Sequence, residues 1–105
     1  AVERGMKAIG NVIDTSADYP NTILASAIWH MEATVDTAIK GVSSGTYVAD
    51  DYGQYSFMAH GGGSLVLDEA LVPADIVSLV KAKEAAIMDG SYTVVINDDA
   101  PVSGK

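Results

Sequence analysis

The sequence predicts an α/β protein whose helices and short buried strands form a three-layer α/β/α sheet. Short apolar runs of strand length occupy residues 6–13 and 22–28, and helical periodicity occupies residues 31–40 and 73–88. The two kinds of segment alternate along the chain, which favours the α/β class. The 105 residues allow one domain at most. Because the predicted strands are too few for a complete doubly wound sheet, we expect the chain to be a fragment.

The first part of the chain predicts two strands joined by a loop. Residues 6–13 are apolar enough for a buried strand, in which Gly10 allows a close backbone approach. Turn-forming residues fill positions 15–21, which include Pro20, and predict a loop. Residues 22–28 are compatible with a second strand, parallel to the first.

The middle of the chain predicts a helix followed by a Gly-rich turn. Within residues 31–40 the apolar positions share one helical face. They are Met31, Val35, Ala38 and Ile39. Gly41 suits the C-cap of this helix. Residues 56–60 predict a short strand that leads into the glycines at 61–63, and residues 64–67 resume an apolar run.

The clearest predicted helix covers residues 73–88. Pro73 suits its first position, and Asp75 complements the helix dipole. Four apolar residues predict its core-facing stripe: Ile76, Leu79, Val80 and Ile87. Lys83 interrupts that stripe, so its stem should lie along the core edge with the ammonium in water. Residues 92–96, rich in β-branched side chains, predict a final strand.

Composition and charge exclude several classes of function. Asp and Glu outnumber Lys and Arg by 14 to 6, so a basic nucleic-acid-binding surface is excluded. The chain has no cysteine and therefore no disulfide or thiolate metal site. Its apolar runs fall well short of the roughly 20 residues that span a bilayer. We expect no cofactor and no metal.

Two side chains at predicted strand ends form the candidate binding site. Asp14 follows the first strand and Trp29 ends the second, and ligands of open α/β sheets bind beyond such carboxyl ends. A carboxylate and an indole can together hold a small polar ring. We expect further ligand contacts from Asn11, His30 and the backbone of Gly62.

Each of these residues also has a structural interpretation. Asp14 can form an Asx-turn with Thr15 and Ser16, and a single Trp is often a core residue. His30 can be a hydrogen-bonded structural histidine. An enzyme is not expected, because no serine lies in a Gly-x-Ser-x-Gly elbow and no paired carboxylates occur at a defined spacing.

The order Gly10-x-x-x-Asp14, then Pro20, then a strand that ends at Trp29, resembles the basic-membrane-protein (BMP) family. Its members are solute-binding proteins of ABC importers with the type I periplasmic-binding-protein fold, and they are related to purine nucleoside receptors. The segments at 37–45, 58–63 and 73–90 are similar to the family's following elements. The resemblance covers nearly the whole chain, but only about the last third of a typical member.

The resemblance implies that residues 1–105 are the C-terminal part of such a protein, mostly its second lobe, with a lobe-crossing segment around 29–50 and the first lobe absent. Many members carry an aspartate where this chain has Val12, and a lysine where it has Trp29. The implied ligand is a purine nucleoside, and these departures extend the expectation to a nucleobase or a similar ring compound.

The same resemblance implies the partners and the location of the parent protein. The partners would be the small-molecule ligand and the ABC permease subunits, with no nucleic acid. The parent would be extracytoplasmic and attached to the membrane only through a lipid anchor in the absent N-terminal region. Two alternatives stay open: a ligand-sensing regulatory domain of the same fold without a transport role, and a sugar-binding receptor. A small hydrolase-like enzyme is a third, weaker one.

Overall fold

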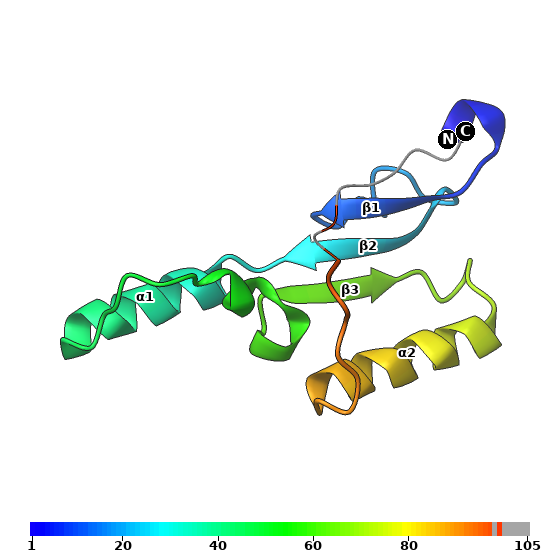
Figure 1. Ribbon diagram of the computed structural model, residues 1–105. Helices are drawn as coiled ribbons and strands as arrows, with labels where there is room; N and C mark the ends of the chain where they lie inside the picture. Colours follow the sequence, from blue (N-terminus) through cyan, green and yellow to red (C-terminus); the bar gives the residue numbers. More distant parts are fainter. Residues whose placement is uncertain (98, 100–105) are drawn as a thin grey trace.

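The computed structural model describes residues 1–97 and 99. Within these residues the chain is a small mixed α/β domain with a three-stranded sheet and two α-helices (Figure 1). The elements are β1 (Ala8–Val12), β2 (Ile23–Trp29), α1 (Glu32–Ser44), β3 (Gly63–Leu67) and α2 (Ala74–Met88). Short 3-10 helices lie at Val2–Arg4, Gly53–Ser56 and Met58–His60. The predicted α/β class is confirmed, whereas the described residues do not form three layers.

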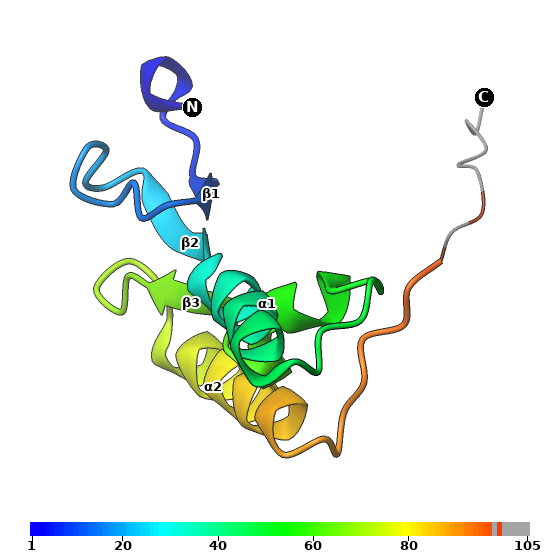
Figure 2. The ribbon, with the colours of Figure 1, turned by 90° about the vertical axis from the view of Figure 1, so that its left-hand side faces the viewer.

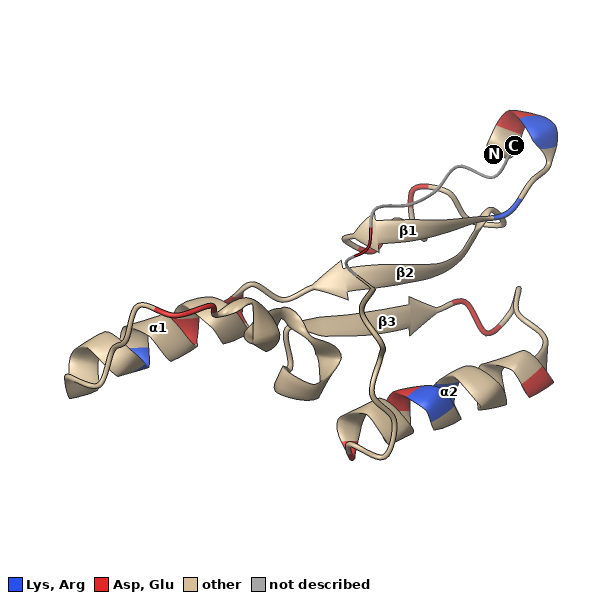
Figure 3. Ribbon diagram, in the orientation of Figure 1, with Lys and Arg blue, Asp and Glu red and all other residues tan. Residues whose placement is uncertain are grey.

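The sheet has the order β1-β2-β3. β1 and β2 are parallel, with Val12 opposite Ile28, as the sequence predicts. β3 is antiparallel to β2, with Gly63 opposite Trp29. The three strands carry no charged side chain, and Figure 3 places the charges on the helices and connections. The acidic balance of the chain is therefore a property of the surface around the sheet.

Two elements of the middle region differ from the prediction. α1 ends at Gly45 rather than Gly41, because Gly45 takes the left-handed conformation (φ 69°) and its N–H donates to the carbonyls of Gly41 and Val42. Residues 56–60 do not form a strand. There the Ser56 hydroxyl donates to the Gly53 carbonyl (2.6 Å), and local hydrogen bonds of this kind favour 3-10 turns over extended backbone.

α2 confirms the clearest predicted helix, with Pro73 as its N-cap rather than its first residue. The predicted core stripe is wrong in detail. Val77 is the buried residue of the helix, at 7% exposure, whereas Ile76 and Leu79 are 43% and 66% exposed. The helix is rotated relative to the predicted stripe, so Lys83 lies outside the core. Its ammonium stands 3.7 Å from the centroid of the Tyr92 ring.

Residues 92–96 are not a strand, which corrects the last predicted element. The Tyr92 N–H donates to the Ala86 carbonyl (2.9 Å), and beyond it the chain runs away from α2 and the sheet, as Figure 2 shows. Val95 is 89% exposed. β-Branched side chains favour a strand only when a sheet edge lies beside them, and within the described residues none does here.

The elements are spread out rather than clustered around one core. In Figure 1, α1 extends past the ends of β1 and β2, while α2 runs beside β3. The described apolar core is small and comprises Ile23, Ala25, Val72 and Val77. α1 buries none of its residues. The radius of gyration is 17.4 Å, against about 13 Å for a compact domain of 100 residues.

Candidate binding edge of the sheet

Asp14 and Trp29 lie at the same edge of the sheet. β1 and β2 are parallel and in register at Val12 and Ile28, so their carboxyl ends meet. Trp29 is the last residue of β2, and Asp14 follows β1 by two positions. The prediction that these two residues sit at the carboxyl ends of neighbouring strands is confirmed. We refer to this region, with Asn11, as the binding edge.

Asp14 is held in an Asx-turn. Its Oδ1 accepts the Ser16 N–H at 2.9 Å, which is the structural interpretation that the sequence left open. This backbone hydrogen bond, followed by bonds from the hydroxyls of Ser16 and Ser26, lowers the pKa of Asp14. Asp14 is also exposed. The turn therefore fixes an ionised carboxylate that keeps lone pairs for a ligand, and its ligand role stays a prediction.

The loop that carries Asp14 folds tightly against the sheet. The Thr15 N–H donates to the hydroxyl of Ser26 at 3.3 Å, and Ser26 is 1% exposed. A Cβ built on Gly10 would lie 2.4 Å from Thr15 Oγ1 and 2.7 Å from Ser26 Oγ. The close approach expected at Gly10 is thus confirmed. Because any side chain at Gly10 would displace the loop, Gly10 positions Asp14 indirectly.

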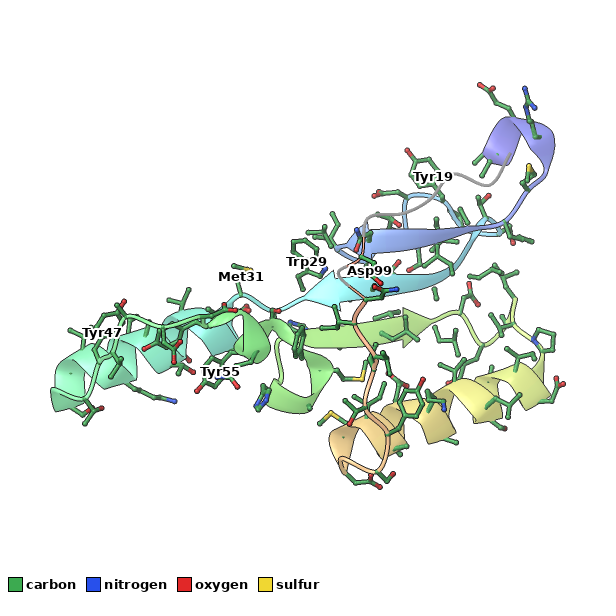
Figure 4. All side chains as sticks on the ribbon, viewed as in Figure 1. Tyr19, Trp29, Met31, Tyr47, Tyr55 and Asp99 are labelled. Atoms are coloured by element: carbon green, nitrogen blue, oxygen red, sulfur yellow. The ribbon has the colours of Figure 1, made fainter. Side chains whose placement is uncertain are left out.

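Trp29 is available as a stacking surface. Its side chain is 58% exposed, and Figure 4 shows it beside the ends of β1 and β2. The alternative interpretation, a core tryptophan, is wrong. Asn11 is exposed one residue before the end of β1, and its Oδ1 accepts the Val12 N–H at 3.0 Å. An exposed indole at the end of a strand suits contact with a planar ring.

Sequence reasoning missed the backbone strain at Val12. This residue has a φ of 77°, which β-branched side chains rarely adopt. Such strain is often found at functional sites. Asn21, at φ 70°, is a residue type suited to the same conformation.

His30 follows β2 and Gly62 precedes β3, and hydrogen bonds hold these two segments together. The His30 N–H donates to the Gly62 carbonyl at 2.9 Å, and His30 Nε2 lies 2.7 Å from the Ser64 hydroxyl. The Gly62 N–H donates to the Phe57 carbonyl at 3.1 Å. A Cβ at Gly62 would lie 2.0 Å from the Tyr55 carbonyl oxygen. These contacts give His30 and Gly62 a structural role beside Trp29, on the β3 side.

Two further features were not anticipated from the sequence. A hollow of about 340 Å³ lies beside the His30–Ser64 pair and is lined by His30, Met58, Gly61, Gly63, Ser64, Glu84 and Met88. An aromatic row runs through Tyr47, Tyr52 and Tyr55, whose neighbouring ring centroids are 5.9 and 5.8 Å apart. The His60 ring meets Tyr55 edge-on at 5.5 Å. This row ties the connection after α1 together.

Within residues 1–97 and 99, no three His, Asp or Glu side chains are grouped as metal ligands. None of the helices in the same residues has the length and apolar composition that crossing a membrane requires. A comparison with protein-family models found no match, and a search of curated proteins likewise found none. The proposal below therefore rests on the sequence pattern and the site geometry.

Proposed function

We propose that this chain is the C-terminal part of a solute-binding protein of an ABC importer, and that it binds a purine nucleoside, a nucleobase or a similar small ring compound. The observation that carries the proposal is the pairing of an ionised Asp14 with an exposed Trp29 at one carboxyl edge. The carboxylate accepts hydrogen bonds from ligand hydroxyls or ring N–H groups, and the indole stacks on the ring. Asn11 adds a polar contact.

The course of the chain supports a two-lobed parent protein. After Trp29 the chain leaves the sheet through α1 and returns at Gly63 (Figure 1). α1 exposes the apolar residues Val35, Ile39 and Val42, which need a partner surface. In the proposal the first lobe covers α1 and closes over Trp29, and the parent completes the three-layer sheet of the type I fold.

A cleft between two lobes gives the proposed receptor its mechanism. Ligand bound at the edge contacts both lobes, so it favours the closed arrangement, and closure marks the loaded protein for the permease. The His30–Gly62 and His30–Ser64 contacts join the segment that leaves β2 to the segment that enters β3. In the proposal the hinge bends at these two segments. The parent would act outside the cytoplasm, held to the membrane by a lipid anchor.

A calorimetric panel tests the proposed ligand class. The natural protein that contains this chain is titrated with purine nucleosides, free nucleobases and simple sugars under one set of conditions. Saturable binding of a purine compound is the expected result. Binding of a sugar alone would replace the nucleoside assignment with the sugar-receptor alternative. No binding by any compound would contradict the receptor function itself.

A further inference from the structure

Ser26 is a buried hydroxyl in the middle of an apolar strand. It is the one residue of β2 with a hydroxyl side chain, and it lies opposite Gly10 of β1. Ser26 is 1% exposed, against 7% for the core residues Ile23 and Ala25 of the same strand. Burying a hydroxyl costs free energy unless it is hydrogen-bonded. Packing alone does not require a hydroxyl here, so the partners of this group indicate its role.

The partners of the Ser26 hydroxyl belong to the loop that carries Asp14. The hydroxyl accepts the Thr15 N–H at 3.3 Å. After the larger contributions of the Ser16 N–H and hydroxyl, a bond from the Ser26 hydroxyl also lowers the pKa of Asp14. A hydroxyl has one donor hydrogen and two acceptor lone pairs, so it can hold the loop backbone and the carboxylate at the same time.

Gly10 brings the loop within reach of Ser26. A Cβ built on Gly10 would lie 2.4 Å from Thr15 Oγ1 and 2.7 Å from Ser26 Oγ, so the loop lies directly on the Gly10–Ser26 pair. All of these groups belong to residues 10–26. The contact is therefore formed within this segment and does not depend on any other part of the parent protein.

The same contact links Asp14 to the strand that carries Trp29. The Asx-turn with Ser16 fixes the carboxylate within its own loop, but it does not fix the loop relative to the sheet. The Ser26 hydroxyl does so, and Trp29 ends the same strand three residues later. The loop and the indole are therefore anchored at points roughly 10 Å apart along one strand.

We propose that Ser26 is a positioning residue of the binding edge, whose buried hydroxyl holds the Thr15 backbone and thereby places the Asp14 carboxylate relative to Trp29. The inference rests on the proposed function for its ligand, although the contact itself can be tested without one. A carboxylate that is held in place before the ligand arrives loses less conformational freedom on binding, which favours affinity. Ser26 thus contributes to binding without touching the ligand.

A ligand-free comparison in the natural protein tests the contact. In Ser26→Ala the Thr15 amide loses its acceptor, so its hydrogen exchange should become at least about tenfold faster. An NMR titration of the Asp14 carboxyl carbon should show a small rise of its pKa. Val77→Ala removes core volume on α2 and controls for a general loss of stability, and it should change neither quantity. If Ser26→Ala also leaves both unchanged, the proposal is overturned.

A double-mutant cycle with the tightest purine ligand tests the positioning role. Ser26→Ala should weaken binding roughly fivefold when Asp14 is present, and less than about twofold in an Asp14→Ala background. A serine that serves only the fold would have the same effect in both backgrounds. An equal effect in the two backgrounds, including no effect in either, therefore overturns the proposal.

A second variant and the ligand-free data keep the two proposals separable. Ser26→Cys keeps a side chain of similar size with a weakly bonding thiol, and it should repeat the pattern even if Ser26→Ala does not fold. If no purine compound binds, the proposed function fails. The Thr15 exchange and the Asp14 titration then still decide whether Ser26 holds the loop.

Discussion

Val12 and Asn21 adopt nearly the same left-handed backbone conformation, which suits asparagine but not valine. Their φ values are 77° and 70°. This conformation is strained for a β-branched residue, whereas asparagine tolerates it. We predict that Val12→Asn raises the free energy of unfolding by about 1 kcal/mol. Asn21→Val should lower it by a similar amount. Urea denaturation of both variants measures the pair, and a loss of stability in Val12→Asn would contradict the strain.

The Asx-turn at Asp14 makes a prediction about pH. Its pKa is lower in the folded chain because the Ser16 N–H stabilises the carboxylate. A lowered folded pKa means that ionised Asp14 favours folding above about pH 4, and that this contribution is lost as the pH falls through the folded pKa.

An NMR titration of the Asp14 carboxyl carbon measures the effect directly. Ser16→Pro removes the amide donor, so the pKa of Asp14 should move back towards its usual value. Ser16→Ala keeps the amide and removes only the hydroxyl, so it should cause a smaller rise. If Ser16→Ala had the larger effect, the hydroxyl rather than the backbone would be the main cause.

At the scale of elements, the position of α2 makes a third prediction. Val77 is 7% exposed and Leu79 is 66% exposed. The core-facing stripe predicted from the sequence included Leu79 but not Val77. Val77→Ala should lower the free energy of unfolding by about 1–2 kcal/mol, because it leaves a cavity. Leu79→Ala should change it by less than about 0.5 kcal/mol. Thermal or urea unfolding of both variants measures the two changes in stability. Equal losses of stability in Val77→Ala and Leu79→Ala would contradict the observed orientation of α2.

The sequence predicts elements better than it predicts their surroundings. The apolar run after Lys7, the turn formers around Pro20 and the run that ends at Trp29 are local signals, and they correctly indicated two parallel strands and their loop. The same was true of α2, because Pro73 and a periodic apolar pattern define it locally.

The failures have a common physical cause. Residues 92–96 have strand propensity but no sheet edge beside them within the described residues, and propensity alone does not supply hydrogen-bond partners. Gly41 and Gly45 are both plausible caps, and only the φ of 69° at Gly45 distinguishes them. At the site, position after a strand predicted where Asp14 and Trp29 lie. The Val12 strain and the hydrogen bonds that occupy Gly62 depend on tertiary contacts that no local pattern reports.

At the scale of the whole molecule, the chain is extended. Its dimensions are 53 × 38 × 29 Å, and α1 lies beyond the carboxyl ends of β1 and β2 without burying a residue. The carboxyl ends of β1 and β2, where the binding edge lies, point towards the side of the molecule on which α1 lies (Figure 1). An open edge of this kind needs a second surface to enclose a ligand, since small-molecule sites bury most of their ligand. The proposed first lobe provides that surface.

The measurement that tests the central claim most directly is a calorimetric comparison of matched variants of the natural protein with its tightest purine ligand. Trp29→Ala should weaken binding by roughly 1–3 kcal/mol, because the stacking surface is lost. Asp14→Asn should weaken it as well. Tyr19→Ala removes an aromatic side chain of similar exposure, 52% against 58%, from the loop before β2 and should leave the affinity unchanged. Unchanged affinity in both Trp29→Ala and Asp14→Asn would contradict a binding site at this edge of the sheet.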